Sequence, residues 1–217
     1  MRMMKLLCVG VCLASTATVW AASYSGNGNT GFAGPIGNGT LEITHDSTNL
    51  HFTLVRGPGG NLNDFLVLYL DTQSGGFTDT AGFFDDFNAS LVAASGYSSP
   101  NQSVVLFPPG FAADLAITVD ATSFDGAGLY ALATGGPLSH QFLTYSDMSG
   151  AEPSNTSFTW SLPLSALNLE EWDTFQFVGT YLNGANAFRS DEAFGDGIPP
   201  GNPGTPSLVT FTSSLAY

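Results

Sequence analysis

DFLVLYLD (64–71) places six consecutive apolar residues between two aspartates. A strand with one face in water would carry a polar residue at every second position. A short, uninterrupted apolar run is instead typical of a strand buried on both faces. The stretch therefore predicts a strand in the middle of a sheet.

Upstream, LEITHDSTNLHFTLVR (41–56) has the pattern of a β-hairpin whose loop is 46–49. This register pairs His45 with Leu50 and Thr44 with His51, and the two-residue alternation then assigns each side chain to a face. One face collects Leu41, Ile43, His45, Leu50, Phe52 and Leu54, and the other collects Glu42, Thr44, His51, Thr53 and Val55. The hairpin should thus have one core face and one wet face.

Further short strands are expected downstream, separated by Gly-, Pro- and Asn-rich turns. They are 103–107, 114–120, 128–134, 140–146, 156–162, 174–182 and 206–217. We expect one short helix at 82–97 and a single helical turn at 163–169, with Pro at its first position. Many short strands with almost no helix predict an all-β fold, an antiparallel β-sandwich of the jelly-roll or Ig-like kind.

The N-terminus has the pattern of a secretory signal peptide. Arg2 and Lys5 precede the apolar run LLCVGVCLASTATVW (6–20), which ends in the small residues Ala21 and Ala22. The run is too short and too poorly flanked to span a membrane. We therefore expect a signal peptide at 1–22, a flexible Gly- and Asn-rich lead-in at 23–40 and a single sandwich domain at 41–217, in a secreted or cell-surface protein.

Composition limits the possible partners. Both cysteines, Cys8 and Cys12, fall within the expected signal, so the mature chain would have no disulfide. After residue 22 only Arg56 and Arg189 oppose eighteen Asp and Glu, which leaves a net charge of −16. Such a chain lacks the cations that neutralise phosphates, which argues against nucleic acid and anionic membrane surfaces as partners.

No recognisable catalytic motif is present. The chain has no Gly-x-Ser-x-Gly, its cysteines leave with the signal, and His45 and His51 fall on opposite faces of the predicted hairpin. Paired carboxylates could act on glycosidic bonds, but no acidic residue lies in a cluster of aromatics and Arg that would position a sugar. We therefore predict a protein that is not an enzyme.

Two acidic, Gly-containing segments are candidates for calcium, which prefers several oxygen ligands on a flexible loop. The first, DTQSGGFTD (71–79), offers Asp71 and Asp79, and the second, RSDEAFGDG (189–197), offers Asp191, Glu192 and Asp196. Neither has EF-hand spacing. The alternative is turn chemistry, since Asp and Gly also dominate turns that bind no ion.

Aromatic side chains are candidates for sugar binding when their faces are exposed. Trp160 alternates with Phe158 and Leu162 and is predicted to lie in the core. Trp172 follows two glutamates ahead of a strand, and we expect it to bind ligand or to cover the edge of the core. Tyr97 and Tyr130 are further candidate ligand contacts.

Arg189 stands next to Asp191 and Glu192 in a chain with few cations. A guanidinium can hold one carboxylate with two parallel hydrogen bonds and can also bond carbonyl groups. We therefore expect Arg189 to be a structural clamp that fixes a loop at 189–197 onto the sandwich.

Four segments resemble the secreted β-sandwiches of the DOMON-like and family 9 carbohydrate-binding-module-like superfamily. They are LVLYLDTQSGGF (66–77), ADLAITVD (113–120), WSLPLSALNL (160–169) and FQFVGTYLNGANAFRSDEAFGDG (175–197). The resemblance implies the sandwich fold and binding of sugars, heme or surface glycans, sometimes with calcium. The Trp pair that clamps sugars in carbohydrate-binding members is not matched, because Trp160 is predicted to be core, and Met148 with His140 does not match the heme ligands.

Two functions follow as hypotheses. The first is a secreted, non-catalytic module that recognises extracellular polysaccharide. The second is a structural component of a cell surface, matrix or filament that associates with itself. A lysine-free domain rich in Ser, Thr and Asn suits both.

Overall fold

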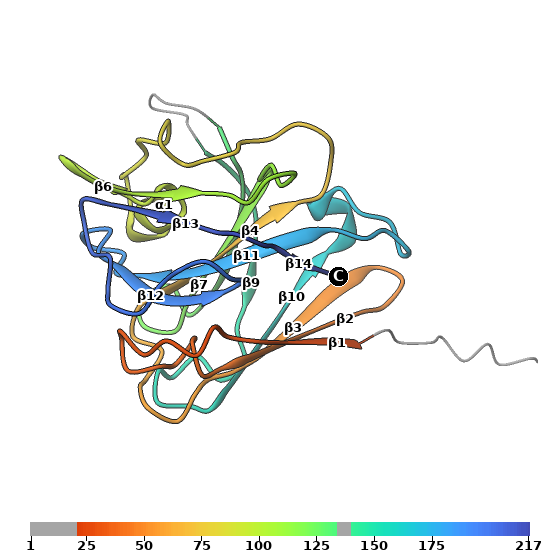
Figure 1. Cartoon of the computed structure of the whole chain (residues 1–217). Helices are drawn as coiled ribbons and strands as arrows, with labels where there is room; N and C mark the ends of the chain where they lie inside the picture. The colour runs from red at the N-terminus through yellow and green to blue at the C-terminus, as the bar shows by residue number, and fades with distance from the viewer. Residues whose placement is uncertain (1–20, 134–139) are drawn as a thin grey trace, which may run out of the picture.

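The computed structural model describes residues 21–133 and 140–217, and within them the chain forms three stacked layers (Figure 1). The expected signal peptide lies outside the described residues except for Ala21 and Ala22, which begin the first strand. The predicted all-β sandwich is confirmed, with a third layer added to it.

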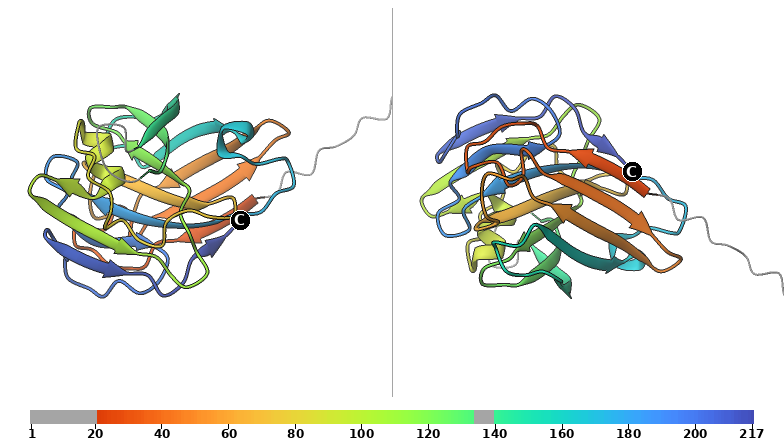
Figure 2. Two further views of the ribbon diagram at one scale, coloured as in Figure 1. Left: turned by 90° about the horizontal axis from the view of Figure 1, so that it is seen from above. Right: turned by 90° about the horizontal axis from the view of Figure 1, so that it is seen from below.

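The first layer is an antiparallel sheet in the order β1-β2-β3-β10. Its strands are β1 (Ala21–Ser25), β2 (Thr40–His45), β3 (Asn49–Val55) and β10 (Ser157–Pro163). The view from below in Figure 2 looks onto this sheet. The predicted hairpin register is confirmed, because His45 pairs with Leu50 and Thr44 with His51. The predicted faces are confirmed too: the six residues assigned to the core are all buried.

The central layer is a seven-stranded sheet in the order β12-β11-β4-β7-β8-β9, with β14 paired to β11. Its strands are β4 (Phe65–Asp71), β7 (Leu115–Asp120), β8 (Gly126–Ala131), β9 (Gln141–Asp147), β11 (Gln176–Leu182), β12 (Arg189–Phe194) and β14 (Leu215–Ala216). The apolar run of residues 65–70 belongs to β4, which lies between β11 and β7. Its prediction as a central strand is confirmed.

The third layer covers the other face of the central sheet (Figure 1). It contains α1 (Ala89–Ser95) and a small sheet in the order β13-β6-β5, made of β13 (Ser207–Thr210), β6 (Asn101–Leu106) and β5 (Tyr97–Ser98). The helix is shorter than predicted because its ends are fixed locally. Asn88 accepts the amide of Leu91 as an N-cap, and Gly96 ends the helix in the left-handed conformation. The helical turn η1 (Leu164–Leu167) follows β10.

Two hydrophobic cores lie on the two faces of the central sheet, and β4 contributes to both. Leu66, Leu68 and Leu70 face the first sheet, whereas Phe65, Val67 and Tyr69 face the third layer. Each of these side chains is at most 5% exposed. Full burial of such side chains stabilises a fold by about 1.5–3 kcal/mol each, which explains why the first six residues of this strand form an uninterrupted apolar run. Trp160 lies in the first core, stacked on Phe52 at a centroid distance of 5.1 Å, as predicted.

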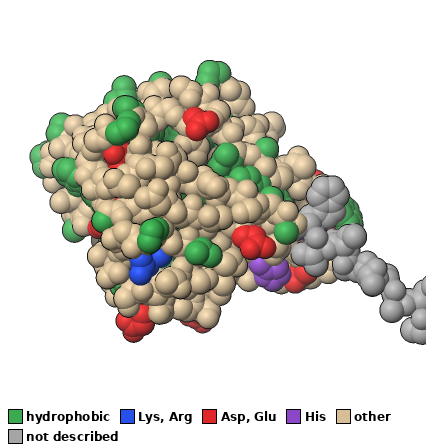
Figure 3. Space-filling view, turned by 60° about the horizontal axis from the view of Figure 1, so that its bottom comes forward, with side chains coloured by type: hydrophobic (Ala, Val, Ile, Leu, Met, Phe, Trp, Pro, Cys, Tyr) green, Lys and Arg blue, Asp and Glu red, His purple; other side chains and the backbone are tan. Residues whose placement is uncertain are grey.

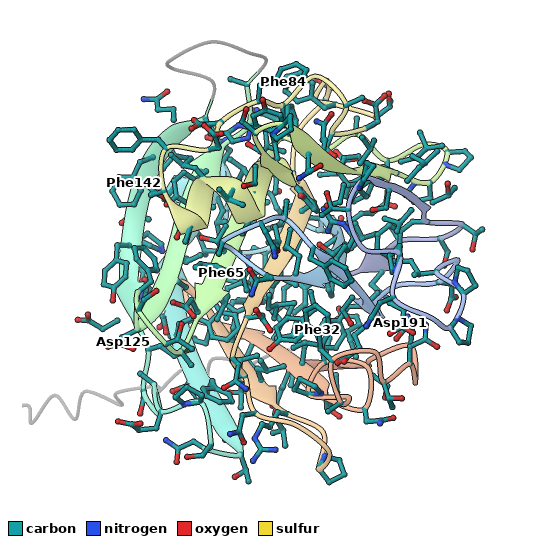
Figure 4. All side chains as sticks on the ribbon, turned by 90° about the vertical axis from the view of Figure 1, so that its left-hand side faces the viewer. Phe32, Phe65, Phe84, Asp125, Phe142 and Asp191 are labelled. Carbon is teal, nitrogen blue, oxygen red and sulfur yellow. The ribbon has the colours of Figure 1, made fainter. Side chains whose placement is uncertain are left out.

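The segment 189–194 corrects the sequence prediction. It is the strand β12 and not a loop, and all six of its residues are buried even though it contains Arg189, Asp191 and Glu192. The two carboxylates are buried because backbone amides from distant parts of the chain donate to them, and the Arg189 guanidinium donates to a hydroxyl and a carbonyl. Figure 4 shows Asp191 close to Phe32, where the N-terminal segment reaches β12.

Candidate functional site

An exposed tryptophan stands between η1 and β11. The side chain of Trp172 is 64% exposed, whereas tryptophan is on average a highly buried residue type. Its position is set by a turn: the amide of Asp173 donates to the carbonyl of Glu170, and the Asp173 carboxylate accepts the Glu170 amide at 2.7 Å. The turn holds the indole out of the core, so its face is available for contact.

Trp172 borders a hollow of about 230 Å³ at one end of the molecule. The hollow lies where β1, β2 and β14 approach the turn before β11. Its walls are Ala21, Ala22, His45, Glu171, Trp172, Asp173, Thr174, Ala216 and Tyr217. We call it the Trp172 hollow. It combines apolar walls with a few polar groups, as binding sites for small ligands do.

His45 lines the Trp172 hollow and contacts two aromatic side chains there. Its ring lies edge-on to both Trp172 and Tyr217, with centroid distances of 5.9 Å in each case. The His45 Nδ1 atom lies 2.7 Å from the Tyr217 hydroxyl, which fixes the ring. Within the described chain, His45 Nε2 has no hydrogen-bond partner although the residue is only 8% exposed. The Nε2 atom is itself shielded from solvent, so a ligand in the hollow does not reach it in this arrangement.

The charge at the Trp172 hollow is negative. Glu171 and Asp173 line it, and neither described Arg does. Arg56 is used elsewhere, where its guanidinium donates to the carbonyls of Asn155, Ser154 and Gly60. Carboxylate oxygens are acceptors only, so they suit a ligand that offers hydroxyl donors.

The candidate calcium residues Asp191, Glu192 and Asp196 are directed to different partners. Glu192 is fully buried and accepts four backbone amides, from Phe32 and Gly34 on Oε1 and from Ile36 and Gly37 on Oε2. The same N-terminal segment that the sequence predicted to be a flexible lead-in is thus bound to β12.

Asp191 accepts the amides of Gly31 and Gly201, and the exposed Asp196 accepts the Ser213 hydroxyl. Within residues 21–133 and 140–217, no group of three or more His, Cys, Asp or Glu side chains has an arrangement that could hold a metal ion. Calcium binding by these residues stays a prediction.

The first acidic loop is also divided. Asp71 ends β4, and its Oδ2 accepts the amide of Ala112. Asp79 bridges to Leu106 of the third layer, and its Oδ1 accepts the amide of Ala81. The two carboxylates thus accept amides from two different segments of the chain.

The two candidate tyrosines do not line the Trp172 hollow. Tyr97 is half-buried in β5, where its ring lies edge-on to Phe84. Tyr130 on β8 is 4% exposed, and burial raises the pKa of its hydroxyl. Of the three aromatic candidates, Trp172 alone stands at a hollow with exposed ring surface.

Arg189 is a clamp of a different kind from the one expected. Its guanidinium is fully buried and donates to the Thr180 hydroxyl at 2.6 Å and to the Ser103 carbonyl at 3.0 Å. No salt bridge joins it to a carboxylate in the described chain. The carboxylates of Asp191 and Glu192 accept backbone amides instead. Burial lowers the pKa of Arg189, as expected for a cation without a countercharge.

The structure also brings together a serine and a histidine. Ser95 Oγ lies 2.9 Å from His140 Nε2, and the Ala133 amide donates to His140 Nδ1. Burial lowers the pKa of His140 to about 4, so the ring is neutral near pH 7. With Nδ1 accepting, Nε2 carries the proton and donates to Ser95. A general base would need the opposite arrangement, so this pair acts as a buried structural hydrogen bond.

Sequence reasoning selected Trp172 but missed His45 and Tyr217. The hairpin pattern did place His45 among apolar residues on the core face, and that position was the available signal. Tyr217 lies 172 positions away from His45, and no local pattern connects them.

Comparisons with known proteins yielded no matching family model, no matching curated protein and no matching solved structure. None of the helices among the described residues is long and apolar enough to cross a membrane.

Proposed function

We propose that the protein is a secreted, non-catalytic module that recognises extracellular glycan through the Trp172 hollow. The exposed indole beside a hollow that is lined by two carboxylates is the observation that carries the proposal. A sugar ring presents apolar C–H groups on its faces and hydroxyls at its rim. The first suit an aromatic face, and the second suit the carboxylates of Glu171 and Asp173.

The surface supports a neutral ligand. In the space-filling view of Figure 3, charged side chains are scattered over the visible face, and most of them are acidic. A net charge near −16 after the expected signal opposes polyanions, whereas neutral glycans pay no such electrostatic cost. Export through the predicted signal peptide would bring the module to such glycans.

Affinity electrophoresis in native gels that contain soluble neutral polysaccharides tests the proposal. The parent protein should be retarded by at least one of them, and Trp172→Ala should migrate as it does in a gel without polysaccharide. Phe87→Ala is the matched control, because Phe87 is 89% exposed and lies in the segment before α1, away from the Trp172 hollow. Equal retardation of parent and Trp172→Ala would refute the proposal.

A second candidate, a self-associating structural protein, is favoured by one observation. β9 is an edge strand of the central sheet, and Phe142, Leu143 and Tyr145 on it are 54%, 37% and 39% exposed. Figure 4 shows Phe142 projecting outward from this edge. Exposed apolar edges are templates for pairing with another chain. Fibres or sheets in electron micrographs that disappear in Leu143→Lys would support this function, and a monomer at high concentration would exclude it.

A further inference from the structure

The Trp172 hollow continues into two further hollows. The second, of about 460 Å³, shares Thr174 and Ala216 with the Trp172 hollow. The third, of about 520 Å³, shares Gln73 with the second. Because neighbouring hollows have wall residues in common, the three lie side by side, and we call this row of hollows the groove.

The groove crosses the strands at one end of the central sheet. Ala216 on β14 pairs with Gln176 on β11, which pairs with Asp71 on β4. At Asp71 the row passes over the end of β4 to the other face of the sheet, because the residue before Asp71 pairs with Leu115 on β7, which pairs with Ala131 on β8. Neighbouring strands are about 4.8 Å apart, so the four spacings from β14 to β8 extend over roughly 19 Å. That length accommodates several sugar rings of an extended chain.

The side chains along the groove are mainly hydrogen-bonding and without positive charge. Neutral polar residues of the second and third hollows are Thr72, Gln73, Ser74, Thr174, Gln176, Ser165 and Asn168. Asp71 and Asp114 add carboxylates. Burial is the largest cause that raises the pKa of Asp114, and the nearby Asp71 also raises it, whereas the hydrogen bonds from the amides of Gln73 and Thr72 act in the opposite direction. A polyanion would be repelled along the whole groove.

We propose that this groove binds an extended, uncharged polysaccharide over several successive rings, with Trp172 as the stacking platform at one end. The inference rests on the proposed function and specifies its ligand class. A site confined to the Trp172 hollow would recognise a single ring or a chain end. A groove that crosses five strands gains affinity with each ring that it contacts, so its affinity depends on chain length.

Isothermal titration calorimetry with neutral oligosaccharides of the glucan, xylan and mannan types, each as disaccharide and hexasaccharide, tests the groove. We expect the hexasaccharide of the preferred type to bind at least 10-fold more tightly than its disaccharide. Gln73→Ala and Gln176→Ala should each weaken hexasaccharide binding by about 2- to 10-fold, the effect of one hydrogen bond, and leave the disaccharide unchanged. Gln141→Ala is the matched control, because Gln141 is exposed on β9 and lines none of the three hollows.

The outcomes separate the two proposals. Equal affinity for both lengths, with binding still lost in Trp172→Ala, would overturn the groove and leave glycan recognition at the Trp172 hollow. Absence of binding to every glycan would overturn both. Polygalacturonate, a polyanion, should not bind, and tight binding of it would overturn the assignment of an uncharged ligand.

Discussion

Replacing Glu192 by Gln tests how the N-terminal segment is held against β12. The Glu192 carboxylate is fully buried, and its four N···O distances to the amides of Phe32, Gly34, Ile36 and Gly37 lie between 2.7 and 3.1 Å. In Glu192→Gln one side-chain oxygen remains an acceptor, while the new NH₂ group faces two backbone N–H donors. Two hydrogen bonds therefore lose their charge, and two amides lose their acceptor.

The magnitude follows from these four bonds. A hydrogen bond to a charged group is worth about 1 kcal/mol more than a neutral one, and each buried amide without an acceptor costs about 1–3 kcal/mol. The neutral side chain is cheaper to bury than a carboxylate, which recovers part of the loss. We expect a net decrease of about 3–5 kcal/mol in the free energy of unfolding, or roughly 10 °C in Tm for a domain of this size.

Thermal and urea unfolding at pH 7 measure this difference. Glu42→Gln is the matched control, because Glu42 is exposed on the outer face of β2. Amide hydrogen exchange adds a local measurement, since the amides of residues 32–37 should exchange much faster in Glu192→Gln. The reasoning fails if Glu192→Gln unfolds like Glu42→Gln and the amides of residues 32–37 stay protected.

Three further perturbations address other buried groups. His140 has a folded pKa of about 4 against 6.5, so the unfolded chain binds its proton first as pH falls, and stability present above pH 6.5 is lost toward pH 4. The loss from pH 7.5 to 5 should be about 2 kcal/mol greater in the parent than in His140→Gln, measured by urea unfolding, and equal losses would contradict it. Arg189→Met keeps most of the side-chain volume and removes an uncompensated charge, so it should lower the free energy of unfolding by less than about 1 kcal/mol. Arg189→Ala should lower it by about 3 kcal/mol, because it also leaves a cavity. Equal losses in the two variants would show that the two hydrogen bonds of Arg189 dominate. Calcium held by Asp191, Glu192 and Asp196 would raise Tm in millimolar calcium over chelator by mass action, and identical melting curves would exclude it.

The parts of the fold that the sequence predicted depend on local patterns. The run 64–71 shows by itself that its strand is buried on both faces, and the hairpin 41–56 contains its own register. Trp160 could be placed in the core because its neighbours at two-residue spacing are apolar. In each case the hydrophobic effect acts on residues that are close in sequence, so the pattern and its cause lie in the same window.

β12 could not be predicted in this way. A strand that contains Arg, Asp and Glu is expected to be exposed to solvent unless its charged groups are hydrogen-bonded within the protein. In β12 the hydrogen-bonding groups come from segments that are distant in the sequence. The amide of Gly37 is 155 positions from Glu192, and the Ser103 carbonyl is 86 positions from Arg189. The third layer was not predicted for the same reason: β13 is distant in the sequence from α1 and β6, and the three are brought together by packing on one face of the central sheet.

The Trp172 hollow combines both situations, and this explains why only one of its three aromatic residues was found. Trp172 is identified by its local context, an indole after two glutamates and before a strand. His45 and Tyr217 acquire a role only when β2 and the end of the chain meet beside that turn. A residue on a core face is normally assigned to packing, and His45 does contribute packing to Trp172 and Tyr217. Its buried Nε2 has no hydrogen-bond partner among the described residues, whereas most buried polar atoms in proteins are paired.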